Sequence, residues 1–408
     1  MVAGPGAVAR DIPGVGITRS EGGTSESADS VRRVFLALRE LRRAKVRFGL
    51  LVAAIGLLVF LILTQQALQD GLITGFVGAI RKQSAPVLVY RVDGQRTFQG
   101  SVITPDLEQE IVGVDGVEEA GKLGQGTFTV EVGGADESDA AIIGYEKAGL
   151  GDPTELTAGR PPAASGEAVG SADDFSLGDE VVVVPGGSTA GAPTRLTVVG
   201  LAEDAQIQVT PTLFVAWPDY ESVVQTANPD ATAVLPSAVA VRPEGGVSDA
   251  EVATRINDAS PEADALTRAE AADETPGVAE VRQSFQVIFL LYGLVVPLVT
   301  GLFFLIVTFQ KSGSLTLLRA IGARSGTLVR SLLIQVLIVM GAGIAVGVAL
   351  YTPLSQAKAG SIALRFDAGA VLFWSVLLLV LGLASALVAA RRVLAIDPLE
   401  ATVGGGQR

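Results

Sequence analysis

The sequence predicts an α+β membrane protein with four transmembrane helices, one and then three, and a large extracytoplasmic α+β domain inserted between helices 1 and 2. Three observations support this fold class. Four long stretches lack charged residues, the block between the first two is strongly acidic, and that block alternates β-rich runs with helical patterns. A chain of 408 residues with a mean hydropathy of +0.47 suits a division into membrane and soluble parts.

The four uncharged stretches cover residues 48–69, 283–310, 331–357 and 368–390. A helix needs about 20 apolar residues to cross a bilayer, so each stretch is long enough for one span. Proton relays and ion pathways usually need an ionisable group inside the membrane. None of the four stretches contains Asp, Glu, Lys or Arg, which argues against a proton-coupled carrier or a charged pore. Gly343-x-x-x-Gly347 has the small-xxx-small spacing of close helix packing, within the subunit or in a dimer.

The basic residues beside the stretches predict the topology of the spans. Four precede the first stretch, residues 311–330 include four and no acid, and Arg391 and Arg392 follow the fourth stretch. Because positive charge is retained on the cytoplasmic side, we expect both termini inside and the acidic block outside. Arg81 and Lys82 fall on the outer side in this scheme, but the consistent flanks outweigh them. A signal peptide is the alternative for the first stretch, although its apolar core would be shorter and no small-x-small cleavage site follows.

These patterns divide the chain into ten segments. The segments are a disordered cytoplasmic N-terminus (1–30), a basic amphipathic elbow helix (31–47), transmembrane helix 1 (48–68), the extracytoplasmic domain (69–282), transmembrane helix 2 (283–310), a cytoplasmic segment (311–330), transmembrane helix 3 (331–352), an external loop (353–369), transmembrane helix 4 (370–390) and a cytoplasmic tail (391–408). The elbow is predicted from apolar residues at three- and four-residue spacing with arginines between them, which suits the inner membrane surface. A direct continuation of helix 1 is the alternative.

The acidic block reads as an α+β domain, with a stalk where it joins helix 2. Predicted strands cover residues 86–92, 127–132, 180–184, 195–201, 213–217 and 238–241, and predicted helices cover 105–112, 218–226 and 248–259. Thr104 or Asp106 is expected to cap the first of these helices and Ser248 the third. Residues 185–193 predict a turn between two strands, and a division into two subdomains would fall near Gly151. Residues 275–285 are expected to form the stalk, with Pro276 in its first helical turn.

The composition excludes several kinds of chemistry. The chain has no Cys and no His, so disulfides, imidazole metal sites and His-based triads are absent. It has no Gly-x-x-x-x-Gly-Lys-Ser/Thr loop, which predicts that ATP is not bound and hydrolysed by this polypeptide. It also has no Gly-x-Ser-x-Gly elbow and no EF-hand spacing. We therefore predict no catalytic residues, no cofactor-binding residues and no metal site.

The net charge of −13 is unevenly distributed. Residues 70–282 contain 12 basic and 35 acidic residues, and the rest of the chain leans positive. A solvated, solubilising surface explains the acidic block, and attraction of a cationic peptide or a divalent ion is the alternative. No basic cluster with interleaved aromatic residues occurs, so nucleic acid is not an expected partner.

Several local motifs agree with one known family. Residues 314–324 read SLTLLRAIGAR, residues 391–401 read RRVLAIDPLEA, and the acidic block contains LTAGRP at 156–161, EAVG at 167–170 and LGDEV at 177–181. With the one-then-three arrangement of spans, these segments resemble the FtsX-like, MacB-type permeases of ABC transporters. The resemblance covers about residues 31–403 and is most specific in the last third.

The resemblance implies a machine with several partners in the plasma membrane. Two permease subunits, identical or related, would pair, and each would contact a cytoplasmic ABC ATPase that holds the ATP and Mg²⁺. Closure of the ATPases would be relayed through the spans to the extracytoplasmic domains, for export or extraction of lipid, lipoprotein or peptide, or for activation of cell-wall hydrolases. Membrane lipid and an extracytoplasmic adaptor, substrate-binding protein or hydrolase are further expected partners.

The cytoplasmic segment contains the candidate residues for coupling to the ATPase. They are expected to form a short helix whose apolar stripe enters a groove on the ATPase while its arginines pair with acids at the rim. A helix lying on the membrane surface, with its arginines reaching lipid phosphates, is the alternative. The candidate ATPase-coupling residues are Leu315, Leu317, Leu318, Arg319, Ile321, Gly322 and Arg324.

Two other functions compete with a transmitting permease. A membrane receptor or scaffold without a motor is the first, although a single span would be enough to anchor it. An ectoenzyme is the second, and the sequence offers it neither a nucleophile elbow nor an imidazole base.

Overall fold

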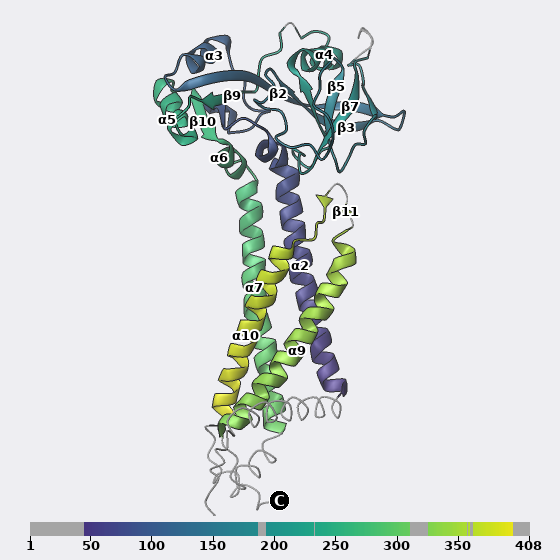
Figure 1. Ribbon diagram of the computed structural model, residues 1–408, viewed down its shortest axis with the longest axis vertical. Helices are drawn as coiled ribbons and strands as arrows, with labels where there is room; N and C mark the ends of the chain where they lie inside the picture. Colours follow the sequence, from purple (N-terminus) through teal and green to yellow (C-terminus); the bar gives the residue numbers. More distant parts are fainter. Residues whose placement is uncertain are drawn as a thin grey trace, which may run out of the picture. The chain divides into compact units, whose positions relative to one another are not determined.

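The computed structural model describes residues 45–186, 193–231, 233–310, 325–356, 358–359 and 362–394 (Figure 1). The chain divides into two compact units. One comprises Met1–Ile55, Pro297–Gly343 and Leu379–Arg408, and the other comprises Gly56–Val296 and Ile344–Leu378. The predicted N-terminal segment, nearly all of the elbow, residues 311–324 and the tail beyond 394 lie outside the described residues.

Four helices in the described part of the chain are long and apolar enough to cross a membrane, which confirms the predicted one-then-three arrangement. The four helices are α2 (Lys45–Lys82), α7 (Val278–Gln310), α9 (Ser325–Leu354) and α10 (Ala368–Leu394). With 38 and 33 residues, α2 and α7 extend past the predicted spans on the side of the inserted domain. The ends of a helix do not mark where it enters and leaves the membrane. The predicted limits of the membrane-spanning segments therefore stay predictions.

The helix α7 begins later in the chain than the predicted stalk. Pro276 was predicted in the first helical turn, but α7 begins only at Val278. Gly277 has a φ of +93°, which lies in the left-handed region, so the chain turns here before the helix starts. Pro276 therefore lies in the turn that precedes α7.

Glycines let the membrane helices approach one another within each unit. In the first unit, a Cβ built on Gly343 of α9 would lie 2.5 Å from Ile55 of α2. In the second unit, a Cβ built on Gly347 would lie 2.6 Å from Val59. Both glycines of the small-xxx-small motif are thus used for packing within this chain.

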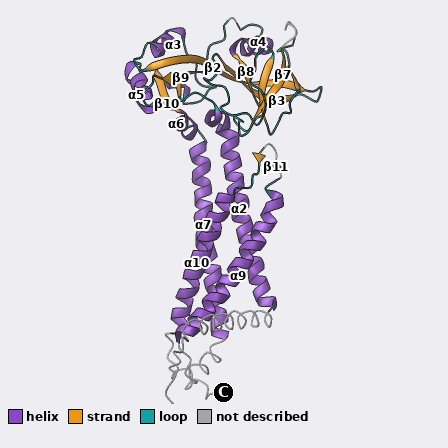
Figure 2. Ribbon diagram, viewed as in Figure 1, coloured by secondary structure: helices purple, strands orange, loops and turns teal. Residues whose placement is uncertain are grey.

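The inserted domain begins with a four-stranded antiparallel sheet in the order β10-β1-β9-β2 (Figure 2). Its chain order is β1, α3, β2, then β9, α5 and β10, which is the split β-α-β pattern of ferredoxin-like folds. Residues of α3 and α5 pack on β1 and β9 to form one apolar core. The elements are β1 (Val87–Arg91), the short helix η1 (Val92–Gly94), α3 (Pro105–Val112), β2 (Val117–Val132), β9 (Ala238–Pro243), α5 (Asp249–Ala259), β10 (Ala263–Thr267) and α6 (Arg268–Asp273).

A second lobe is inserted between β2 and β9. Six of its strand pairs close into a ring, in the order β2-β3-β8-β5-β7-β6 and back to β2, so this lobe is a small barrel. Residues of α4 contribute to the apolar core inside it. The remaining elements are β3 (Ser138–Tyr145), β4 (Ala158–Gly159), β5 (Glu167–Ser171), β6 (Glu180–Val183), β7 (Arg195–Ala202), β8 (Thr212–Ala216) and α4 (Trp217–Ala227).

The structure confirms most of the predicted elements and corrects their grouping. All six predicted strands and all three predicted helices are present, and the side chains of Thr104 and Ser248 cap α3 and α5 as expected. The bounds agree within a few residues except for the strand predicted at 127–132, which begins ten residues earlier, at Val117. The predicted split near Gly151 is wrong, because β3 before it pairs with β8 after it. The 16-residue strand β2 belongs to both lobes, since its first half pairs with β9 and its second half with β3 and β6. Residues 187–192 of the predicted 185–193 turn lie outside the described residues, but β6 and β7 on either side pair as antiparallel strands.

Candidate functional site

The end of α2 is fastened to a loop of the barrel lobe, residues 203–210, which we call the docking loop. The amide of Ala79 donates to the carbonyl of Gln206 at 2.8 Å, and the carbonyl of Gly75 accepts from the amide of Val209 at 2.8 Å. Gly75 and Ala79 are four residues apart, so in a regular α-helix these two groups bond to each other. The loop backbone therefore joins the hydrogen-bond ladder of the helix, and the attachment does not depend on any side chain.

Contact between α2 and the docking loop is close enough to require a glycine. A Cβ built on Gly78 would lie 3.0 Å from the carbonyl carbon of Asp204, nearer still to its oxygen, and 3.2 Å from the carbonyl oxygen of Gln206. A Cβ on Gly75, one turn earlier, would make only ordinary contacts, at 3.4 Å from Cγ2 of Val209. The backbones of helix and loop thus touch at Gly78.

The docking loop has an unusual backbone. The φ values of Asp204, Gln208 and Val209 are +57°, +53° and +58°. They lie in the left-handed region of backbone conformation, which residues other than glycine rarely adopt. For a β-branched residue such as Val209 this conformation costs of the order of 1–3 kcal/mol, and it persists only where surrounding contacts enforce it. The amides of Gln208 and Val209 donate hydrogen bonds to carbonyl groups of α2, and these bonds are contacts of that kind.

A second contact joins α2 to the start of α7. The carboxylate of Asp273, at the end of α6, accepts hydrogen bonds from Arg81 of α2 at 2.9 Å and from Arg282 of α7 at 3.0 Å. Partial burial opposes ionisation of this carboxyl group, but the hydrogen bonds from Arg282 and Arg81 outweigh it and lower the pKa of Asp273. One charged side chain thus bridges two helices and the ferredoxin-like lobe.

A third contact comes from the connection between α9 and α10. The guanidinium group of Arg365 lies 2.8 Å from Asp173, 2.8 Å from Glu203 and 2.6 Å from Asp204, all on the barrel lobe. Burial raises the pKa of Asp204, although Arg365 opposes the shift. The docking loop is therefore held on one side by α2 and on the other by Arg365.

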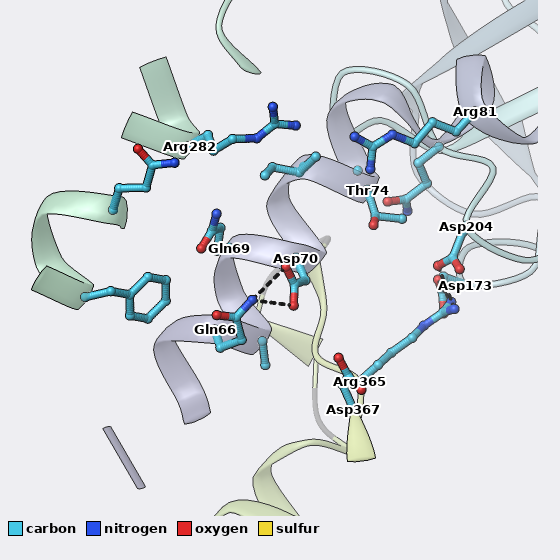
Figure 3. A pocket seen from close by; sticks show the side chains of 17 residues that line it. Gln66, Gln69, Asp70, Thr74, Arg81, Asp173, Asp204, Arg282, Arg365 and Asp367 are labelled. Atoms are coloured by element: carbon cyan, nitrogen blue, oxygen red, sulfur yellow. Dashed lines mark hydrogen bonds and ion pairs between the residues drawn. The ribbon is translucent and has the colours of Figure 1, made fainter. Parts of the chain in front are cut away.

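These three contacts surround a polar cavity of about 640 Å³ (Figure 3). In Figure 3, Arg365 extends toward Asp173 and Asp204, whereas Asp70 of α2 lies beside Gln66. Both carboxylate oxygens of Asp70 accept from the Gln66 amide, at 2.9 and 3.0 Å. The charged residues that line the cavity are Asp70, Arg81, Asp173, Asp204, Arg282, Arg365 and Asp367.

Several of the charged side chains that line the cavity form ion pairs. Arg365 pairs with Asp173 and Asp204 of the lining, whereas Arg81 and Arg282 pair with Asp273 outside it. The described residues contain no group of three or more acids that could hold a metal ion. Ion pairs beside water are weak individually and can exchange partners at small cost. The contacts of α7 and of the α9–α10 connection depend on such side-chain ion pairs, whereas the contact of α2 also includes backbone hydrogen bonds.

The structure does not place the predicted coupling residues. All seven, from Leu315 to Arg324, lie outside the described residues, and their role stays a prediction. Sequence reasoning also missed the three contacts found here. A usable signal was present in the glycines at 71, 75 and 78, which continue a helical spacing beyond the uncharged stretch. Another was Arg365, a lone arginine in the short connection before the last span.

The chain resembles known proteins along nearly its full length, although no family model matches it. It is 25% identical over 379 residues to the uncharacterised ABC transporter permease Rv0072 of Mycobacterium tuberculosis H37Rv, covering 91% of this chain and 99% of that one. It is 28% identical over 114 residues to a putative hemin transport system permease protein HrtB of Staphylococcus epidermidis, covering 28% and 32% of the two chains.

Among solved structures, the periplasmic region of MacB from Actinobacillus actinomycetemcomitans aligns with 47% of this chain and 92% of that one. The identity is 11% and the TM-score 0.33. The full-length relative and the one-then-three arrangement of membrane helices around an α+β domain lead to one conclusion. Over nearly its whole length this chain is similar to an ABC transporter permease, and its arrangement of membrane helices is the one expected from a resemblance to the FtsX/MacB type.

Proposed function

We propose that this permease transmits ATP-driven conformational change from a separate cytoplasmic ATPase to its inserted domain, which lies outside the cytoplasm. One observation supports the proposal above all. Three separate elements, α2, α7 and the α9–α10 connection, each make specific polar contacts with the base of the same domain. A movement of any of these elements is delivered to the domain through those contacts.

The helix α2 is suited to act as the stiff member of this linkage. Its 38 residues correspond to about 57 Å at a rise of 1.5 Å per residue, which exceeds the hydrocarbon thickness of a bilayer. Its backbone bonds to the docking loop leave little freedom at the far end. Displacement of the helix is therefore expected to displace the barrel lobe.

The energy would come from a partner chain. Because the sequence has no phosphate loop, ATP and Mg²⁺ belong to a cytoplasmic ABC ATPase in this proposal. The segment from Leu315 to Arg324 would dock on that ATPase, with Leu318 and Gly322 at the contact. The family resemblance supports a second permease subunit, identical or related, and a lipid, lipoprotein or peptide as the cargo.

Hydrogen exchange on the assembled complex tests the proposal. The permease and its ATPase are placed in nanodiscs, and exchange is measured by mass spectrometry with and without trapped ATP. Peptides that cover the docking loop and residues 268–282 should change together on ATP binding. Peptides that cover α3 (Pro105–Val112), which makes none of the three contacts, serve as the internal control.

A partner ATPase unable to bind nucleotide provides the second control and should abolish the change. If the ATPase hydrolyses ATP while exchange at the docking loop and at residues 268–282 stays at its nucleotide-free rate, no motion reaches the domain. The proposed transmission would then be wrong.

A further inference from the structure

The polar cavity of about 640 Å³ at the base of the inserted domain has an excess of positive charge in one part of its lining. Arg81 of α2 and Arg282 of α7 share a single carboxylate, that of Asp273, at 2.9 and 3.0 Å. Each arginine side chain is 39% exposed, and neither has another acidic partner within the described part of the chain. One positive charge of this pair is therefore available to an anionic group in the cavity.

A second part of the lining has an excess of negative charge. Asp70 accepts hydrogen bonds from the neutral amide of Gln66, and Asp367 accepts one from the backbone amide of Gly369. Both aspartates are exposed, and neither forms an ion pair with a basic residue among those that the structure describes. In the view of Figure 3, both lie below the two arginines. The lining consequently offers a site for a cation as well as a site for an anion.

The cavity also contains a buried amide without a partner. Gln69 of α2 is only 9% exposed, yet its side chain makes no hydrogen bond within the described residues. Its amide keeps some accessible surface, so a group in the cavity can reach it. In the view of Figure 3, Gln69 lies between Arg282 and Asp70. The neighbouring Gln66 differs, because its amide donates to Asp70 and accepts from Trp374. Since buried polar groups are nearly always hydrogen-bonded, the amide of Gln69 indicates a polar ligand here.

The charged residues of this lining mark the predicted edge of the membrane. Asp70 directly follows the uncharged stretch of α2, Arg282 directly precedes that of α7, and Asp367 directly precedes that of α10. Trp374 of α10, whose indole nitrogen donates to Gln66 at 3.4 Å, is of a residue type that is enriched where membrane and water meet. Because three predicted spans end at this cavity, its charged groups lie at the depth of the lipid headgroups.

A lipid headgroup bound at this depth has to match both signs of charge. An anionic headgroup alone would leave Asp70 and Asp367 without a counter-charge. A choline headgroup has no N–H to donate and would depend on several aromatic rings, whereas the described lining includes only one, that of Phe289. A primary ammonium group donates three hydrogen bonds, which the two carboxylates and Oε1 of Gln69 can accept. The lining therefore fits a phosphate combined with a primary ammonium group.

We propose that this cavity binds the zwitterionic headgroup of a lipid of the phosphatidylethanolamine type. The phosphate lies against Arg81 and Arg282, and the ammonium group lies against Asp70 and Gln69. The acyl chains stay in the bilayer, beside the exposed apolar side chains of α7. Such a lipid contacts both α2 and α7 and stabilises their attachment to the domain by mass action. This binding is independent of the transmission proposed above and holds whether or not the helices transmit motion.

The lipid selectivity of the full chain tests this site. The protein is placed in nanodiscs that contain equal amounts of phosphatidylethanolamine, phosphatidylcholine and phosphatidylglycerol with identical acyl chains. Native mass spectrometry then identifies the lipid that stays bound after release from the disc. The unaltered protein should retain phosphatidylethanolamine in preference to both other lipids. Phosphatidylcholine is the sharpest comparison, because it has the same net charge and differs only in the methyl groups on its nitrogen.

Three variants assign the preference to the cavity. Gln69→Leu removes the unpaired amide, so it should unfold at the same or a higher temperature, while the preference falls by roughly tenfold, the effect of one hydrogen bond to a charged group. Asp70→Asn removes the charge, keeps the shape of the side chain and should lower the preference at least as much. Gln65→Leu, one turn before Gln69 and outside the lining, is the matched control and should keep the preference.

A soluble analogue separates a lipid from a free zwitterion. Glycerophosphoethanolamine has the same headgroup without acyl chains and should displace the bound lipid only at a much higher concentration. Displacement at equal concentration would show that the cavity takes a soluble zwitterion, and the assignment to a lipid would be wrong.

Three results with the lipid mixture would also overturn the proposal. The first is equal retention of phosphatidylethanolamine and phosphatidylcholine by the unaltered protein, as expected if only water bonds to Gln69. The second is an undiminished preference in Gln69→Leu. The third is preferred retention of phosphatidylglycerol, which would indicate a site for anions alone.

Discussion

Replacing Gly78 of α2 by alanine tests whether the docking loop fastens this helix to the domain. In the interior of a helix, a Gly→Ala change normally stabilises by about 1 kcal/mol. At Gly78 the new methyl group would lie 3.0 Å from the carbonyl carbon of Asp204 and nearer to its oxygen, so backbone must move. Overpacking of this kind costs typically about 1–3 kcal/mol. We therefore expect a net change from near zero to a loss of about 2 kcal/mol.

Gly75→Ala is the matched control. It lies one turn earlier on the same helix, and its methyl group would meet Cγ2 of Val209 at 3.4 Å and Oε1 of Gln206 at 3.5 Å, which are ordinary contacts. Gly75→Ala should gain the stability that alanine gives to a helix, without the steric clash expected in Gly78→Ala. The difference between the two variants then isolates the clash, at about 1–3 kcal/mol.

The measurement is thermal unfolding in nanodiscs, followed by tryptophan fluorescence. For a domain of this size, 1 kcal/mol corresponds to roughly 2–4 °C, so Gly78→Ala should unfold several degrees below Gly75→Ala. The ATP-dependent change in hydrogen exchange at the docking loop should also be smaller in Gly78→Ala. If Gly78→Ala is as stable as Gly75→Ala and couples equally well, the close contact is absent in the working protein and the reasoning fails.

Three further predictions concern the other contacts and the topology. Burial raises the pKa of Asp204 and Arg365 opposes that rise, so Arg365→Gln should raise this pKa further. A raised carboxyl pKa lowers stability only where the carboxyl group is ionised, so the loss in unfolding temperature should be largest at neutral pH and shrink as the pH falls through the raised pKa of Asp204. If the difference in unfolding temperature between Arg365→Gln and the unaltered protein does not vary with pH, this role of Arg365 is wrong. Leu318→Asp and Gly322→Leu should each lower the ATP turnover of the co-purified complex, and unchanged turnover in both would show that the ATPase docks elsewhere. A single cysteine at exposed Asp258 should react with a membrane-impermeant maleimide in intact cells; reaction only after lysis would reverse the topology.

The sequence was sufficient for features that depend on neighbouring residues. The membrane helices follow from long uncharged runs, and α3 and α5 follow from caps at Thr104 and Ser248 that act within three residues. The predicted strands succeeded where Val, Ile and Leu are concentrated, as in β7 and β8. In each case the signal and the structure occupy the same short segment.

The features that were missed depend on distant partners. The first half of β2 contains glycines and charged residues and has low intrinsic strand preference, yet pairing with β9, more than a hundred residues later, makes it a strand. Ring closure of the barrel is likewise fixed by pairs such as β3 with β8. The partner of Arg365 at Asp173 is 192 residues away in sequence. Local periodicity holds no information about such pairings.

The docking loop shows why the most informative part of the site was the least visible in the sequence. Its left-handed residues include Gln208 and Val209, whereas that conformation is usually occupied by glycine, asparagine or aspartate. The strain is maintained by α2, which is more than a hundred residues earlier in the chain, so neither segment reveals it alone.

The three contacts at the domain base also differ in stiffness, and this difference suggests how motion is divided among them. Backbone hydrogen bonds with a glycine contact, as between α2 and the docking loop, allow no adjustment without breaking. The bridges made by Asp273 and Arg365 use long, half-exposed side chains that can follow a shift of an ångström or more. If the proposed transmission operates, α2 and the barrel lobe should move together, while α7 and the α9–α10 connection should slide against the domain and set the limits of its movement.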